Sequence, residues 1–143
     1  MTSWRKSYRS EMRAALQDDA RFSGWTEISV DAKTLDDGAL PAIAVGTPRE
    51  MSARDGMDST QRDTSLVVVV KRAGTDAFAL EDLCDDDAAQ IEAVAAEALS
   101  DASRQWQLTE TRYSTDTEGG RAVGTLMMLF SVVTWPSDPL DLT

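Results

Sequence analysis

Residues 3–20 and 81–99 each place apolar side chains three or four positions apart, which is the spacing of one face of an α-helix. The apolar positions are Trp4, Tyr8, Met12, Ala15 and Leu16 in the first segment and Cys84, Ala88, Ile91, Val94, Ala95 and Ala98 in the second. Thr2 or Ser3 is a suitable N-cap for the first helix, and Asp82 is one for the second. The pattern therefore predicts two amphipathic helices.

Five further segments have the composition of β-strands, with alternating or continuous apolar and β-branched residues. They are residues 25–30, 40–47, 64–72, 107–116 and 122–135. Pro41 opens the second strand, where a missing N–H is tolerated. Residues 35–38 predict a turn, and Glu118-Gly119-Gly120 predicts the turn of an antiparallel hairpin between the last two strands.

The segment from Pro48 to Asp63 differs from its neighbours because it is polar and charged and has no apolar periodicity. A loop of this length inside a compact domain is usually functional or disordered. The sequence predicts a mobile contact loop here, with plain disorder as the alternative.

This order of elements predicts an α+β fold, with a mainly antiparallel sheet of about five strands and two helices on one face. We expect residues 1–135 to form a single domain, which suits a chain of 143 residues, and residues 136–143 to run as an extended tail.

Two of the predicted strands are apolar on both sides, which bears on assembly. In the third strand Leu66, Val68 and Val70 point one way, while Val67 and Val69 point the other way. Two helices on one face leave the second face uncovered, so it needs a partner, most simply another copy of the chain. The alternative is a curled sheet that buries both faces within one subunit.

Composition excludes several classes of function. The chain has no histidine and one cysteine, Cys84, which excludes histidine-based nucleophile systems, histidine-ligated zinc, internal disulfides and CxxC sites. The net charge of −11 disfavours binding to phosphate backbones and anionic lipid. The apolar runs are too short to span a membrane, no signal peptide is expected, and the lone cysteine favours an intracellular origin.

Charge is also unevenly distributed along the chain. Residues 73–103 hold nine acidic residues and no lysine or arginine, whereas Arg5, Arg9 and Arg13 form a basic stripe on the first helix. A basic and an acidic helix can pack together within one subunit, or they can form the complementary head-to-tail surfaces that close a ring. For the arginine stripe, a simple solvated face is a further alternative. The candidate contact residues are Arg5, Arg9, Arg13, Arg49, Glu50, Arg54, Asp55, Arg62, Asp76, Asp82, Asp85 and Asp86.

The residues offer little for catalysis. Consecutive residues of a helix point about 100° apart, so Asp85, Asp86 and Asp87 cannot converge on one ion, although a divalent site shared between subunits stays open. The attraction of carboxylates to the positive N-terminal end of a helix accounts for the three consecutive aspartates. Cys84 lies on the apolar stripe and is interpreted as a core residue. No phosphate-binding glycine loop is present. We therefore predict no enzyme activity, no catalytic residues, no metal and no cofactor.

The order of several motifs resembles a known family. The run Leu40-Pro41-Ala42-Ile43-Ala44-Val45 precedes a polar loop that ends in Thr60-Gln61-Arg62-Asp63. A valine-rich strand, a helix that opens with Leu80-Glu81-Asp82-Leu83 and continues through Ile91-Glu92, and a hairpin that ends in a hydrophobic strand follow. Over residues 40–135 this order resembles the tail terminator proteins of phages with long non-contractile tails, the lambda-type minor tail protein U family, and the terminators of gene transfer agents.

The resemblance implies an α+β subunit of a hexameric ring that caps the head-proximal end of a tail tube. Such a ring stops tube polymerisation and meets the head connector, and DNA passes through its lumen, where an acidic wall would not retain the duplex. The implied partners are further copies of the chain, the major tail protein and neck proteins, with no membrane. The implied place is the neck of a virion or phage-like particle, assembled in the bacterial cytoplasm.

Other functions stay open at this point. One is another neck component, such as a head-closure or tail-completion protein. A small acidic ligand-binding domain or enzyme is a further alternative, which a deep pocket in the monomer would favour.

Overall fold

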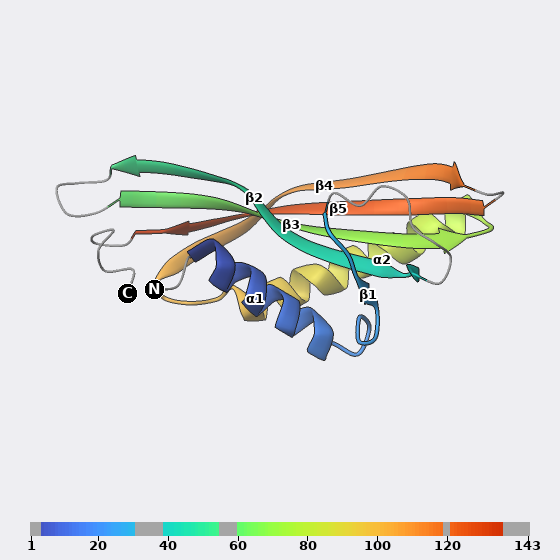
Figure 1. Cartoon of the computed structure of the whole chain (residues 1–143), viewed down its shortest axis with the longest axis horizontal. Helices are drawn as coiled ribbons and strands as arrows, with labels where there is room; N and C mark the ends of the chain where they lie inside the picture. The colour runs from blue at the N-terminus through green and yellow to red at the C-terminus, as the bar shows by residue number, and fades with distance from the viewer. Residues whose placement is uncertain (1–3, 31–38, 55–59, 119–120, 136–143) are drawn as a thin grey trace.

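The computed structural model describes residues 4–30, 39–54, 60–118 and 121–135, which contain two helices and one five-stranded sheet (Figure 1). The elements are α1 (Trp4–Asp18), β1 (Thr26–Glu27), β2 (Ala42–Arg54), β3 (Thr60–Gly74), α2 (Ala77–Ala98), β4 (Arg104–Glu118) and β5 (Arg121–Thr134). The strand order is β1-β2-β3-β5-β4, antiparallel except for the parallel pair β1–β2. The predicted α+β fold is confirmed. The predicted turn at 35–38 and tail at 136–143 lie outside the described residues.

The main core lies between the sheet and the two helices, which pack on the same face (Figure 1). The alternate residues Leu66, Val68 and Val70 of β3 point into this core and are fully buried. Met12 of α1 and Ile91 of α2 meet them from the helix side, each with no exposed surface. The helical and strand periodicities of the sequence therefore identify the same core.

The second face of the sheet carries a smaller apolar cluster, which the chain itself covers. Ala44, Val67 and Val69 are at most 5% exposed, and Ile28 and Val30, which follow β1, pack against them. The prediction that this face needs another copy of the chain is therefore wrong for the central cluster. The predicted strand at residues 25–30 is shorter in the structure, where only Thr26 and Glu27 pair with β2, and nothing in the sequence indicated that the residues after it cover this face.

The predicted loop at 48–63 is wrong, because most of it continues β2 and β3. Arg49 is opposite Ser65 and the pairing runs on to Arg54 opposite Thr60, after an irregularity between Gly46 and Arg49. We call residues 48–54 of β2 the arm strand. All of it except Glu50 is exposed, and apart from Pro48, Met51 and Ala53 its side chains are polar, so the apolar alternation is too weak to mark it as a strand. Residues 55–59 lie outside the described residues.

Helix α2 begins earlier than predicted. The Asp76 carboxylate accepts hydrogen bonds from the backbone N–H groups of Phe78 at 3.0 Å and Ala79 at 3.4 Å, and Asp76 is therefore the N-cap in place of Asp82. Apolar periodicity does not reveal the first turn of α2, because Phe78 is 84% exposed and does not contribute to the apolar face of the helix.

Candidate interaction surfaces

The arginine stripe of α1 lies against the outer edge of β2. Arg13 donates to the backbone carbonyl of Val45 at 3.1 Å, Arg5 donates to the carbonyl of Thr47, and Arg9 donates to the Thr47 hydroxyl. These bonds occupy edge groups just beyond the point where β1 stops pairing. The three guanidinium groups therefore close part of an open sheet edge within the chain. Contact with a partner stays a prediction for them.

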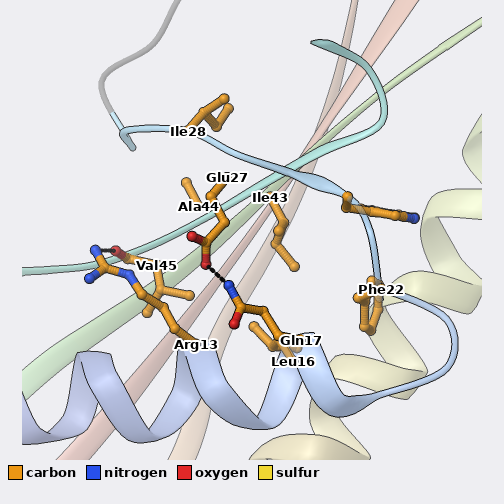
Figure 2. A pocket seen from close by; sticks show the side chains of 10 residues that line it. Arg13, Leu16, Gln17, Phe22, Glu27, Ile28, Ile43, Ala44 and Val45 are labelled. Carbon is orange, nitrogen blue, oxygen red and sulfur yellow. Dashed lines mark hydrogen bonds between the residues drawn. The ribbon is translucent and has the colours of Figure 1, made fainter.

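Figure 2 shows a hollow between α1 and the β1–β2 edge. Phe22 and Ile43 form its inner wall, and a hydrogen bond from Gln17 to Glu27 crosses its mouth. Its volume is about 20 Å³, roughly the space of one water molecule. Ligand sites usually enclose about 300–1,000 Å³, so this hollow offers no support for the ligand-binding alternative.

A buried ionic group joins the loop after α1 to β3 and α2. Asp87 has no exposed surface, and its carboxylate accepts hydrogen bonds from Arg21 at 2.6 Å and from Arg72 at 2.6 and 3.0 Å. The hydrogen bond to Asp87 raises the pKa of Arg72, whose guanidinium also lies 4.6 Å from the centre of the Trp25 ring. Sequence reasoning missed this group, because its members are far apart in the chain.

The other carboxylates at the start of α2 behave as surface groups. Asp82, Asp85 and Asp86 are exposed, and among the described residues none of them forms an ion pair. The buried face of the helix carries Cys84, as predicted, and burial raises the pKa of its thiol to about 11. The structure therefore separates Asp87, which is internal, from the predicted contact residues beside it.

The arm strand and its neighbour form a polar surface. Arg62 donates to Glu50 at 3.2 Å and Glu50 also accepts from Thr64, which ties the arm strand to β3. Arg49 and Met51 point away from these groups, and Met51 is 56% exposed. Of the predicted contact residues in this region, Glu50 and Arg62 therefore bond each other, whereas Arg49 and Arg54 are exposed.

The predicted contact residues do not form one surface. The α1 arginines bond β2, Arg62 bonds Glu50, Asp76 caps α2, and the α2 carboxylates face solvent. Arg49 and Arg54 lie on the exposed arm strand, while Asp55 lies outside the described residues.

In the described part of the chain, no group of three or more acidic or cysteine side chains is arranged to hold a metal ion. The helices of that part are also too short or too polar to cross a membrane. No family model and no curated protein matches the chain.

Proposed function

We propose that this chain is a structural ring subunit of a phage or gene transfer agent tail, of the tail terminator type. It caps the head-proximal end of the tail tube and stops further polymerisation there. The proposal combines the resemblance over residues 40–135 with one surface of the molecule, the exposed arm strand.

The observation that carries the proposal is the exposed arm strand. The end of the sheet that holds it extends past the two helices (Figure 1). Six of its seven residues are exposed, including Met51, and its outer edge has no strand beside it in the described part of the chain. A strand exposed on both faces and along one edge gains stability when another chain covers it. This surface therefore supports an assembly role, because a neighbouring chain can add to it.

The charge of the molecule is consistent with this role. The net charge of −11 reflects 25 acidic residues against 14 basic ones, and carboxylates such as Asp82, Asp85 and Asp86 are exposed at the surface. An acidic ring presents a repulsive wall to DNA that passes through it.

The test is deletion of the gene in a strain that produces the particles, followed by electron microscopy of their tails. We expect tails that are overlong or not joined to heads, and restoration by the wild-type gene supplied in trans. A matched strain that carries Asp101→Asn, a change at an exposed loop residue, should keep normal tails. Tails of normal length that are attached to heads in the deletion strain would refute the proposal.

A further inference from the structure

The sheet has two open edges of different character. Strand β4 is the last strand on one side, and among the described residues no strand pairs with its outer edge. On the other side, β1 and the α1 arginines cover β2 only up to Thr47, so the arm strand is also open. Each edge presents unpaired backbone N–H and C=O groups, which pair readily with another strand.

Residues 111–117 of β4 lack three of the features that commonly prevent such pairing, namely proline, lysine and a β-bulge. The strand contains no proline, glycine or lysine. Its irregularity lies between Leu108 and Glu110, so residues 111–117 pair regularly with β5, and all of them except Tyr113 are exposed. The arm strand and this part of β4 are each seven residues long, and the arm strand offers backbone N–H groups from Arg49 onward, because Pro48 has none.

The strand directions favour a head-to-tail contact. β2 is antiparallel to β3, β3 to β5, and β5 to β4, so β2 and β4 run in opposite directions. A second copy placed beside β4 in the same orientation therefore presents its arm strand antiparallel to β4. The antiparallel ladder is the more stable arrangement and continues the alternation of the sheet.

The cover on β2 sets the stagger between the copies. In the second copy, β1 pairs at Ala42 and Ile43 and would collide with β4 if the two sheets were level. The arm strand and the C-terminal end of β4 lie at opposite ends of the sheet (Figure 1). A shift along the strands brings the arm beside residues 111–117 and moves β1 of the second copy past the end of β4.

Opposite charges then meet on one face. Arg49 is opposite Ser65 of β3, whereas Asp116 is opposite Val123 of β5, which is itself opposite Ala73 of β3. Ser65 and Ala73 are eight positions apart on a regular strand, so Arg49 and Asp116 point to the same side of the sheet. Both side chains are exposed, and neither forms an ion pair in the described part of the chain.

We propose that residues 48–54 of one copy add as an antiparallel strand to residues 111–117 of a second copy, with Arg49 opposite Asp116. The same register places Met51 opposite Ser114 and Ala53 opposite Arg112. The contact is heterologous, because each copy offers a different edge to each neighbour, and such a contact builds a ring when the rotation between successive copies closes. This inference rests on the proposed ring and names the surfaces that build it.

The register is tested by cross-linking in a Cys84→Ala background. A Met51→Cys chain is mixed with a Ser114→Cys chain under mild oxidation and analysed on non-reducing gels. Directly opposite residues of an antiparallel pair have Cα atoms about 4.5–5.5 Å apart, which suits a disulfide. We expect a mixed disulfide in this pair. The control pairs Met51→Cys with Thr115→Cys, which faces the other side of the sheet and should cross-link far less.

Charge reversal tests the ion pair by sedimentation of the full chain. Arg49→Glu and Asp116→Arg should each weaken self-association about tenfold, because a like-charge pair replaces an attractive cross-strand pair. The double variant restores opposite charges and should return to within about twofold of wild type. Asp85→Arg makes the same charge change as Asp116→Arg on an exposed helix and should leave self-association nearly unchanged.

Two results would overturn the inference. One is equal cross-linking of Met51→Cys to Ser114→Cys and to Thr115→Cys, or no cross-linking of either pair at millimolar protein. The other is a double variant as weak as the singles. If these occur while the deletion strain still has overlong tails, the ring role stands and a different surface builds it.

Discussion

Asp87 lies in a run of three aspartates, but its surroundings differ from those of its neighbours. It is fully buried between Arg21 and Arg72, whereas Asp85 and Asp86 are exposed. Removing one partner of a buried ion pair leaves a desolvated charge without compensation, which costs far more than losing a surface pair. This carboxylate therefore contributes to stability by holding three segments of the chain together.

Asp87→Asn should lower the free energy of unfolding by about 3–5 kcal/mol, because two guanidinium groups lose their carboxylate. Urea unfolding followed by circular dichroism measures the change. Asp86→Asn is the matched control and should change the free energy by about 0.5 kcal/mol or less. Equal effects of the two substitutions would contradict an internal role for Asp87.

Cys84 gives a dependence of stability on pH. Burial, and then the nearby charge of Asp87, raises the pKa of its thiol from 9.0 to about 11. Between these values the unfolded chain releases the thiol proton while the folded chain keeps it, so the free energy of unfolding falls as pH rises. Wild type should lose more stability between pH 9 and pH 11 than Cys84→Ala, as measured by urea unfolding at each pH. Parallel curves for the two proteins would contradict this.

At the scale of elements, the start of α2 shows how a cap sets a helix boundary. Asp76 is in an extended conformation and satisfies two backbone N–H groups of the first turn. Asp82, which the sequence favoured as the cap, lies inside the helix.

Asp76→Ala should reduce the free energy of unfolding by about 1 kcal/mol, the usual cost of losing an N-cap side chain. Asp76→Asn should retain most of the stability, because its side-chain oxygen also accepts from the first turn. Asp82→Ala is the control and should have little effect or stabilise slightly, since it removes an exposed like charge. Thermal unfolding distinguishes these outcomes, and a larger loss for Asp82→Ala would contradict the assignment.

The α1 arginines show how elements share polar groups. Like charges spaced four residues apart weaken an isolated helix by a few tenths of a kcal/mol per pair. Here Arg5, Arg9 and Arg13 each donate to acceptors on the β2 edge. The stripe therefore combines repulsion within α1 with hydrogen bonds that attach α1 to the sheet.

At the scale of the whole molecule, the two open edges should be visible by hydrogen exchange. Amides of β3 and β5, which are flanked by strands on both sides, should exchange slowly at every protein concentration. The outward amides of residues 111–117 should exchange rapidly in dilute protein. They should become protected at concentrations where multimers form, while the inward amides of β4 act as an internal control. Rapid exchange that is unaffected by concentration would argue against strand addition.

The arm strand could not have been identified from its own residues. Most of its side chains are polar and six of its seven residues are exposed, whereas strand patterns report burial of one face. Its conformation comes instead from backbone pairing with β3, from Arg49 opposite Ser65 to Arg54 opposite Thr60. Backbone hydrogen bonds do not depend on side-chain polarity, so they leave no pattern in the sequence. The polar composition of residues 48–63 therefore predicts a loop.

The sequence by itself determined the two helices, the valine-rich strand, the terminal hairpin and the α+β class, because each follows from apolar periodicity within about twenty residues. It also placed Cys84 in the core. The tertiary structure alone decided that Asp87 is internal, that the α1 arginines bond β2, and that the residues after β1 cover the second face. Arg21 and Asp87 are 66 positions apart, and Arg5 and Thr47 are 42 apart. Local patterns report which side of an element is buried, whereas the partner that buries it is chosen only when distant segments pack together.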